Sequence, residues 1–441
     1  MTAADSAPHD PAPARDDAAA GEGATVDEGS SSPPPGRRRG RWRLRLLALG
    51  LGLAFGLFLG ELGARVLGLG ATTLTRGALH VYDPEVGWRC TSKLDARYQK
   101  PGSFDVRIRC NARGLRDLED HPYAKPPGER RVVVLGDSAM WGWGLENDET
   151  FAARLEAELP ETECLNLAAN GYSAVQSLIR LETEGVRYEP DAVVYAFVAN
   201  DLEDNFDDKK GGRPVAELGP DGGLRIVNRP VRRRWKPAYK QWLRHHSRLF
   251  GLLEFSTARL KVYLRTRAAA RAQADADAAR QAAAKAYWHK IESRRAKGRI
   301  VLSALDLYGT PGEVVEHAWR TQRAVLAAMR ERARAAGARL VVVFVTGRAE
   351  VDRAIFRETI ARYGLDPGDP ALGLDWDRPR RRLAALCREL GLAFVDPTEA
   401  FRATGAVDAL FLRNDGHWSP RGARLAAAQA APVVRSLLPG S

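Results

Sequence analysis

The 441-residue chain has only four cysteines, and no two of them form a C-x-x-C pair. A zinc site built from paired cysteines is therefore disfavoured. The sequence also lacks G-x-x-x-x-G-K-[ST], the phosphate-binding loop of many nucleotide hydrolases. Its most acidic run, residues 200–208, has neither the central glycine nor the final glutamate of a calcium-binding EF-hand. We interpret that run as a solvated loop, and no metal or cofactor is expected.

The four cysteines stand in two kinds of context. Cys90 and Cys110 flank a short polar stretch and could pair in an oxidising compartment. Cys164 opens an apolar run and Cys387 lies in a helical pattern, so both are expected to be buried thiols.

The N-terminal part of the chain reads as a polar tail. Residues 1–36 are mostly Ala, Pro, Gly, Ser and acidic residues, with almost nothing to bury. A disordered tail is therefore predicted over 1–44, and it ends in a basic stretch. Six arginines make up that stretch: Arg37, Arg38, Arg39, Arg41, Arg43 and Arg45.

A long apolar run follows, and it predicts a transmembrane anchor over 45–70. Only Glu61 and Arg65 interrupt it, and they lie one helical turn apart, where they could pair. At about 1.5 Å per residue such a helix can cross a bilayer core of roughly 30 Å. A cleaved signal peptide is disfavoured because the basic stretch begins nearly forty residues in and no A-x-A site follows. The positive-inside rule then predicts a cytoplasmic N-terminus, with the rest of the chain periplasmic or extracellular.

Positive charge is concentrated in one segment. The whole chain has a formal net charge of +12, whereas residues 229–299 hold 20 Lys and Arg against 4 Asp and Glu, a local charge of +16. This segment is either a solvated charged face or a surface for an anionic lipid or polymer. Nucleic acid is disfavoured as a partner, because the segment is expected to lie outside the cytoplasm.

The remaining chain alternates short apolar runs with helical patterns. Residues 71–128 are turn-rich and are interpreted as a lead-in to a larger domain over 129–441. Strands are predicted at 131–135, 164–167, 192–198, 339–345 and 392–396, and helices at 148–159, 174–186, 315–337, 377–390 and after Ser419-Pro420. Nearly continuous apolar strands between helices indicate an α/β fold with a doubly wound parallel sheet. Residues 207–299 break the alternation and are predicted to be a helical insertion.

Four polar fragments fall at loops on one predicted edge of this sheet, where ligands of such folds bind. They are Gly136-Asp137-Ser138, Asn170-Gly171, Asn200-Asp201, and Asp415 with His417. Each alone has an ordinary structural explanation, as a helix N-cap, a turn, a solvated loop or a structural histidine. Their joint placement favours a site for acyl transfer.

The fragments supply each part of such a site. Ser138 is the candidate nucleophile, His417 its base, and Asp415 the group that orients the imidazole. The backbone N–H groups of Ser138 and Gly171, with the side-chain amide of Asn200, could form an oxyanion hole. An ordinary α/β-hydrolase is disfavoured, because Met140 replaces the second glycine of a G-x-S-x-G motif.

In order and content the fragments resemble the SGNH (GDSL-type) hydrolase superfamily, over roughly residues 129–206 and 300–441. The resemblance implies a flavodoxin-like sheet, the catalytic and oxyanion roles given above, and supporting roles for Asp137 and Asp201. Two departures stand out. Val198 occupies a position where the third block normally has glycine, and Asp415 and His417 are two residues apart instead of three. The resulting D-x-H-W form is similar to the alginate O-acetyltransferase-like branch, and Gly416 would permit the bend between the two residues.

We therefore expect a membrane-anchored serine esterase or O-acyltransferase that acts on acyl groups, chiefly O-acetyl, of a cell-surface glycan. Its expected partners are an acylated carbohydrate or small ester and the lipid bilayer at 45–70, with an anionic lipid or polymer at 229–299. Two alternatives remain open: an inactive fold that binds polysaccharide, and a scaffold that uses the basic insertion to engage a membrane or partner proteins.

Overall fold

The computed structural model describes residues 38–67, 79–100, 102–208, 211–232, 239–240, 242–243, 246–272, 276–296 and 300–440. The tail predicted over 1–44 lies outside these residues up to position 37. The chain divides into two compact units, Met1–Phe58 and Leu59–Ser441.

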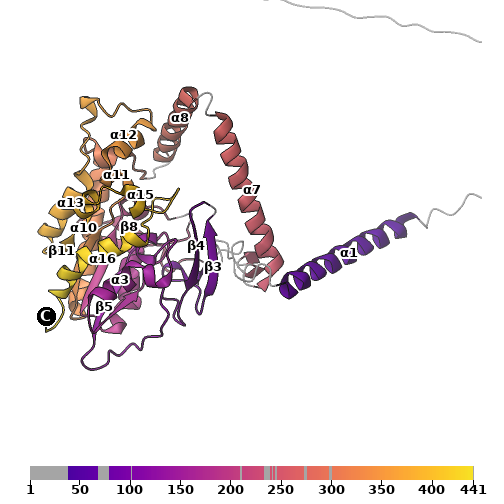
Figure 1. The fold of residues 1–441 in the computed structure, drawn as a ribbon, viewed down its shortest axis with the longest axis horizontal. Helices are drawn as coiled ribbons and strands as arrows, with labels where there is room; N and C mark the ends of the chain where they lie inside the picture. Colours follow the sequence, from indigo (N-terminus) through magenta and orange to yellow (C-terminus); the bar gives the residue numbers. More distant parts are fainter. Residues whose placement is uncertain are drawn as a thin grey trace, which may run out of the picture. The chain divides into compact units, whose positions relative to one another are not determined.

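Five parallel strands form the central sheet of the second unit (Figure 1). They are β5 (Arg130–Leu135), β6 (Thr162–Asn166), β7 (Ala192–Phe197), β10 (Arg339–Phe344) and β11 (Ala393–Val395). Their spatial order is β11-β10-β7-β5-β6, which, counted along the chain, is the flavodoxin-like order 2-1-3-4-5. The prediction of a doubly wound parallel sheet is confirmed.

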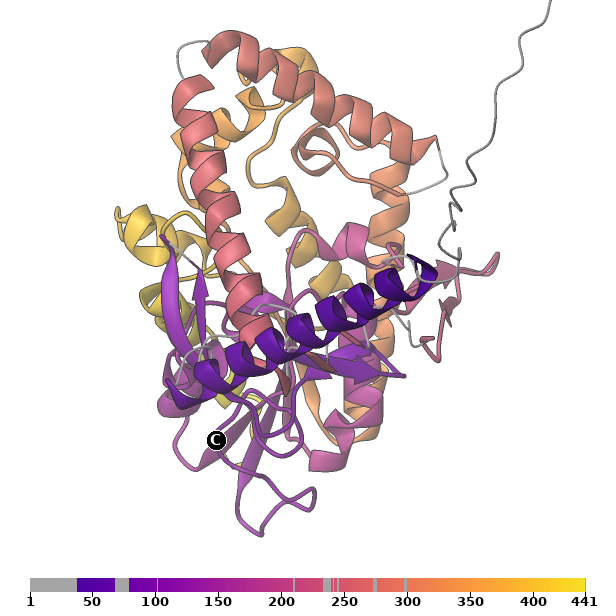
Figure 2. The same ribbon diagram turned by 90° about the vertical axis from the view of Figure 1, so that its right-hand side faces the viewer.

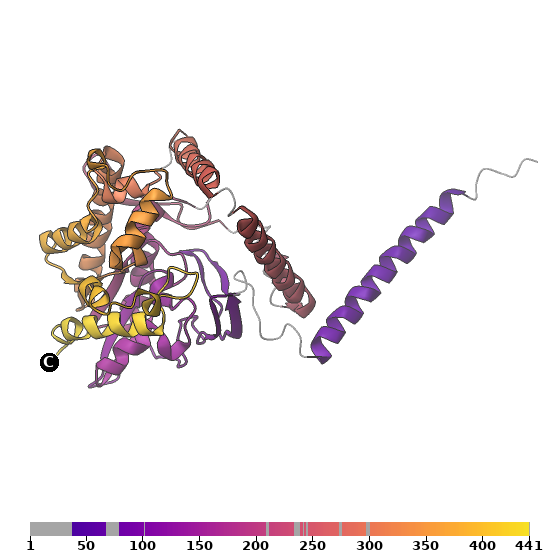
Figure 3. The ribbon, with the colours of Figure 1, turned by 45° about the horizontal axis from the view of Figure 1, so that its top comes forward.

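Helices cover both faces of this sheet because successive strand residues point to opposite sides. Val132 and Val134 face a core shared with α3 and α16, which lie side by side (Figure 3), whereas Val133 and Leu135 face a core shared with the helices of the other side. The covering helices are α3 (Phe151–Glu158) and α16 (Pro420–Arg435) on one face, and α4 (Ala174–Thr183), α10 (Glu313–Ala335) and α13 (Arg378–Glu389) on the other.

Several short helices were not predicted. They are α2 (Ser138–Trp141), α5 (Asp201–Asp204), α9 (Ala304–Tyr308), α11 (Arg348–Val351), α12 (Arg353–Ala361), α14 (Thr398–Ala403) and α15 (Val407–Leu410), with 3-10 turns at η2 (Asn147–Glu149), η3 (Gly185–Tyr188) and η5 (Pro370–Leu372). Most span one or two turns, so they show too little of the 3.6-residue repeat to be recognised from sequence.

The insertion predicted as helical over 207–299 begins with a strand pair. An antiparallel hairpin, β8 (Val215–Leu218) and β9 (Leu224–Val227), precedes two long helices, α7 (Arg248–Ala272) and α8 (Ala276–Arg295) (Figure 2). The hairpin turn contains Gly219, Gly222 and Gly223, a turn composition that the prediction overlooked.

The lead-in consists of two antiparallel hairpins, over the described residues from 79 onward. β1 (His80–Asp83) pairs with β2 (Gly87–Cys90), and β3 (Asp95–Lys100) pairs with β4 (Phe104–Arg109). A disulfide joins Cys90 to Cys110 and closes a loop around the β3–β4 hairpin. Cys164 and Cys387 are buried free thiols.

The apolar N-terminal helix is α1 (Arg38–Val66), and its segment Arg41–Val66 is long and apolar enough to cross a membrane, since it contains an 18-residue window with a mean hydropathy of 1.9. Arg65 donates to Glu61 at 2.7 Å, as their spacing suggested. The Glu61 carboxylate also accepts hydrogen bonds from Ser247 and from the backbone of Arg248 at the start of α7. This charge in the apolar run thus caps a second helix.

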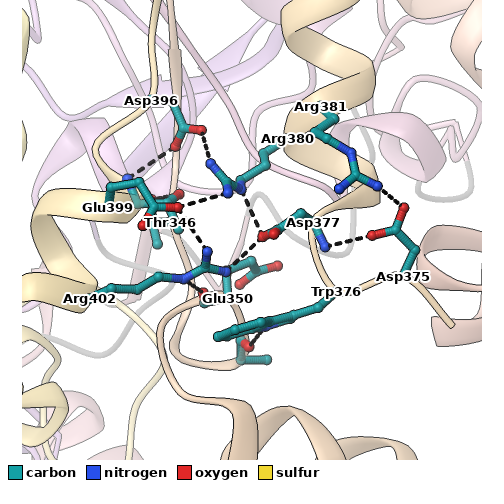
Figure 4. A network of polar contacts seen from close by, with 12 residues as sticks. Thr346, Glu350, Asp375, Trp376, Asp377, Arg380, Arg381, Asp396, Glu399 and Arg402 are labelled. Carbon is teal, nitrogen blue, oxygen red and sulfur yellow. Dashed lines mark hydrogen bonds and ion pairs between the residues drawn. The ribbon is translucent and has the colours of Figure 1, made fainter.

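An ion-pair network ties together the segments around β11 (Figure 4). Arg380 contacts Asp377 at 2.8 Å and Asp396 at 2.9 Å, and Arg402 contacts Asp377 at 2.7 Å. The Arg402 guanidinium also lies 3.8 Å from the centroid of the Trp376 ring. Burial alone would raise the pKa of Asp377, but hydrogen bonds from Arg380 and Arg402 outweigh it and lower the pKa to about 2.

We predict that Asp377→Asn destabilises the protein in a pH-dependent way. The pKa of Asp377 is lower in the folded protein than its ordinary 3.8, so its ionised form stabilises the fold fully above about pH 4. This contribution disappears as the pH falls through about 2. At pH 7 the variant should lose about 2 kcal/mol of unfolding free energy, since one pKa unit corresponds to about 1.4 kcal/mol.

Unfolding of the full chain in detergent at pH 7 and near pH 2 measures this difference. Glu358→Gln is the matched control, because its pair with Arg362 is exposed on both sides and should contribute less than about 0.5 kcal/mol. A loss at Asp377 that is equal at both pH values would contradict the ion-pair explanation.

Candidate active site

Ser138 lies at the first turn after β5, next to the point where the strand order reverses. Gly136 has φ 145°, and a Cβ there would lie 3.0 Å from the Met140 side chain, so only glycine fits this turn. The Asp137 carboxylate caps α2 by accepting a hydrogen bond from Ala139 N at 2.9 Å. The serine is thereby placed, half-buried, at the helix N-terminus.

The structure brings Ser138, His417 and Asp415 into one chain of hydrogen bonds. Ser138 Oγ lies 2.7 Å from His417 Nε2, and His417 Nδ1 contacts Asp415 Oδ1. Asp415 Oδ1 also accepts a hydrogen bond from His417 N at 3.0 Å. The two-residue spacing is therefore compatible with a triad, because one carboxylate oxygen receives both the ring and the backbone N–H of the same histidine.

The loop that holds the acid and base is closed by tertiary contacts. Phe411 and Trp418 form a β-bridge, and Leu412 N donates to His417 O at 2.9 Å. Trp418 is buried and its indole donates to the Thr346 carbonyl at 2.8 Å, beyond the end of β10. The tryptophan of the D-x-H-W form thus ties the loop of Asp415 and His417 to the sheet.

Gly416 lies in a bend over residues 415–417, as expected, but it does not use the backbone freedom that is particular to glycine. Its φ lies outside the left-handed region, and a Cβ at this position would meet nothing within 4 Å. The left-handed residue of the loop is Asn414, with φ 55°. Asparagine tolerates this conformation better than most side chains, so Asn414 permits the turn that leads into Asp415.

Two carboxyl groups are buried behind the serine. Burial raises the pKa of Asp137, against hydrogen bonds from the backbone N–H groups of Ala139 and Ser138. Burial and the nearby Asp137 raise the pKa of Asp201 well above its ordinary value. Asp201 Oδ2 accepts hydrogen bonds from Tyr195 at 2.7 Å and from Val198 N at 3.0 Å, so its contacts fix the loop after β7.

The three candidate oxyanion donors, from Ser138, Gly171 and Asn200, lie in different surroundings. Gly171 has φ 73°, and a Cβ there would lie 3.9 Å from the Trp88 ring, so the glycine is needed for its conformation and not for space. Asn200 is exposed, and its side-chain amide donates to Asp204 at 2.8 Å. The Ser138 N–H lies at the first residue of α2. Participation of these three donors stays a prediction.

Two contacts of Asp415 were not foreseen from the sequence. Lys100, at the end of β3, forms an ion pair with Asp415 Oδ2, and the Trp143 indole donates to the same oxygen at 3.2 Å. Burial raises the pKa of Asp415, but the hydrogen bonds from His417 and Lys100 outweigh this and lower the pKa below its usual range. Nothing in the local sequence could reveal a pair whose members are 315 positions apart.

A cavity of about 760 Å³ lies on the Asp415 side of the triad. Its lining includes Arg348, Arg413 and Asp408, and Arg348 is paired with Asp408. Among the described residues, no group of three or more His, Cys, Asp or Glu is arranged to hold a metal ion.

A family model described as "SGNH hydrolase-like domain, acetyltransferase AlgX" matches residues 310–441. This segment, 132 of the chain's 441 residues, is similar to that family. The resemblance to the SGNH hydrolase superfamily and its alginate O-acetyltransferase-like branch is thereby confirmed, and the chain carries a domain of the SGNH hydrolase or acetyltransferase type. The roles of Asp415 and His417 stay predictions. The catalytic serine candidate, Ser138, lies before the matched segment. No curated protein matched the sequence.

Three solved structures illustrate what this chain is similar to. TesA is 13% identical, and the match covers 70% of this chain and all of TesA with a TM-score of 0.33. A lipase/acylhydrolase from Enterococcus faecalis is 11% identical, with 71% of this chain and 98% of that chain covered and a TM-score of 0.34. A mutant of Axe2, an acetyl-xylooligosaccharide esterase from Geobacillus Stearmophilus, is 13% identical, with 70% of this chain and 94% of that chain covered and a TM-score of 0.32. TM-scores of this size are too low to support a conclusion about substrate or activity.

We predict that Asp201→Asn is tolerated and Asp201→Ala is not. The raised pKa of Asp201 favours a neutral side chain, and an asparagine oxygen can still accept from Tyr195 and Val198 N. Alanine would leave both buried donors unsatisfied, at a cost of about 1–3 kcal/mol each. Chemical unfolding of the three proteins measures the difference. Equal losses for the two variants would show that the charge of Asp201 is needed.

Proposed function

We propose that the protein is a serine esterase or O-acyltransferase that removes or transfers small acyl groups, chiefly acetyl, through an acyl-enzyme. The observation that carries this proposal is the 2.7 Å contact between Ser138 Oγ and His417 Nε2, with Asp415 on the other ring nitrogen. A serine hydroxyl needs such a base to become a nucleophile.

The proposed reaction has two steps. His417 Nε2 takes the Ser138 proton as Oγ attacks the ester carbonyl, and the resulting imidazolium is stabilised by Asp415. Collapse of the tetrahedral intermediate breaks the ester bond, the leaving alkoxide takes the proton from His417, and the acyl group stays on Ser138. Water then releases it in an esterase, whereas a sugar hydroxyl accepts it in a transferase.

We further propose that the acceptor or substrate is a cell-surface glycan and that the enzyme is anchored with its catalytic domain outside the cytoplasm. The arginines before the apolar helix favour a cytoplasmic N-terminus. The Cys90–Cys110 disulfide favours an oxidising compartment for the rest of the chain. Acetyl chemistry on an exported polysaccharide fits both the position and the D-x-H-W loop.

The basic insertion is proposed to lie on the lipid surface. Leu253, Leu260 and Leu264 are all more than half exposed and fall on one face of α7 at helical spacing. Arg259 and Lys261 lie exposed between them along the chain. Exposed leucines among cations on one helix support contact with the surface of an anionic bilayer.

We predict that Ser138→Ala and His417→Ala each lower hydrolysis of p-nitrophenyl acetate by at least about a thousandfold, because each removes a member of the triad. Ser436→Ala, at the exposed end of α16, is the matched control and should retain normal turnover. Near-normal activity in either triad variant would overturn the proposed function. A wild-type protein whose Ser138 never reacts with a fluorophosphonate, yet which binds glycan, would favour the inactive binding protein instead.

We also predict that α7 contacts lipid in the full chain. A spin label at Leu260→Cys, in vesicles of mixed neutral and anionic lipids, should be accessible to oxygen and shielded from a soluble nickel complex. The native thiols do not compete, because two are buried and two are disulfide-bonded. A label at Ala283→Cys, exposed on α8, is the comparison. Equal nickel accessibility at both sites would contradict a lipid contact at α7.

A further inference from the structure

The two lead-in hairpins contact opposite sides of the candidate site. From β1–β2, the Trp88 indole donates to the Asn170 carbonyl at 3.0 Å, next to Gly171. From β3–β4, Lys100 pairs with Asp415. The lead-in is therefore part of the site's structure and not only a connection to the membrane helix.

The β3–β4 hairpin also packs against the imidazole through aromatic rings. Tyr98 and Phe104 lie with their ring centroids 5.3 Å and 5.6 Å from that of Trp143, and Trp143 lies 5.8 Å from His417. Trp143 in turn donates to Asp415 Oδ2. The hairpin thus contacts the carboxylate directly through Lys100 and indirectly through Trp143.

The contacts of Asp415 divide between its two oxygens. Oδ1 contacts the ring and the backbone N–H of His417, whereas Oδ2 accepts from Lys100 and from the Trp143 indole. The Asp415 side chain is only 5% exposed, so its charge has lost most of its hydration and must be compensated by the protein. Lys100 supplies the positive charge of that compensation, and its own side chain stays 41% exposed.

We propose that Lys100 is a positioning residue of the active site: it holds Asp415 ionised and turned toward His417, and its charge sets the acidic limit of activity. The proposal rests on the proposed function, because it concerns the same serine, histidine and aspartate. A cation beside Asp415 weakens the stabilisation of a protonated His417. Its removal therefore lets the imidazole keep its proton to higher pH, where it cannot serve as a base.

Other charges also surround this pair, and they stay in place when Lys100 is changed. Asp137, at the start of α2, interacts electrostatically with His417. Arg413, Arg348 and Asp408 line the cavity together with Asp415. A Lys100 variant therefore changes one charge near Asp415 and no other, so a shift in the pH profile can be assigned to Lys100.

The test compares Lys100→Met, Lys100→Gln and Lys100→Arg in the full chain. The readouts are the pH profile of fluorophosphonate labelling at Ser138 and the kcat and KM for p-nitrophenyl acetate. In the Met and Gln variants, we expect the acidic limb of the labelling profile to move to higher pH by about half a unit to one unit. Lys100→Met should also lower kcat by roughly tenfold to a hundredfold with KM nearly unchanged, because the base is misplaced.

Arginine should restore most of the activity and the normal acidic limb, because it keeps the charge. The control is Arg97→Gln, which breaks an ion pair with Asp105 in the same hairpin without touching Asp415. Arg97→Gln should leave the labelling profile and the kinetic constants unchanged. The melting temperature of each variant is measured to show that it is folded.

Two outcomes would overturn the role of Lys100. One is a Lys100→Met profile that superimposes on the wild type, and the other is a uniform loss of activity with an unmoved acidic limb and no recovery in Lys100→Arg. Failure of the proposed function looks different, because the wild-type serine would then not be labelled at any pH.

Discussion

The hydrogen bonds that converge on the Asp415 carboxylate join three parts of the chain that are distant in sequence. Lys100 comes from the β3–β4 hairpin, Trp143 from the loop after α2, and His417 from the loop before α16. A nearly buried carboxylate without these donors would be strongly unfavourable. Because His417 is turned by Asp415 toward Ser138, the geometry at the serine depends on the same contacts.

The sheet and the triad could be predicted from sequence for one physical reason. Strands buried on both faces must be apolar almost without interruption, so runs such as 131–135 and 192–198 are visible without an alignment. Parallel strands place their carboxyl ends at one edge, so the polar residues that follow them gather there. The strand ends thus indicated Ser138, and the resemblance to the SGNH superfamily added Asp415 and His417 from the loop before the last helix; the structure has the three in contact.

What could not be predicted depends on contacts between distant residues or on very local geometry. Lys100 lies in an exposed, mixed hairpin where a lysine is unremarkable, and only the folded chain brings it to Asp415. The left-handed backbone of Asn414 was not predicted, and the bend at Gly416 lies outside the left-handed region, because a glycine's freedom does not require that it be used. The β8–β9 hairpin was not predicted, because the basic, helix-forming residues that follow it indicated a helical insertion over the whole of 207–299.

The disulfide between Cys90 and Cys110 has a consequence for when the site is complete. The segment that it closes into a covalent ring is the hairpin that presents Lys100, Tyr98 and Phe104 to the catalytic loop. Closing the ring removes conformations that the open hairpin would sample. In the topology that we propose, the newly made chain has its serine, histidine and aspartate in a reducing cytosol but does not yet have this ring. Under that proposal, translocation and thiol oxidation are maturation steps that complete the site only outside the compartment in which the chain is synthesised.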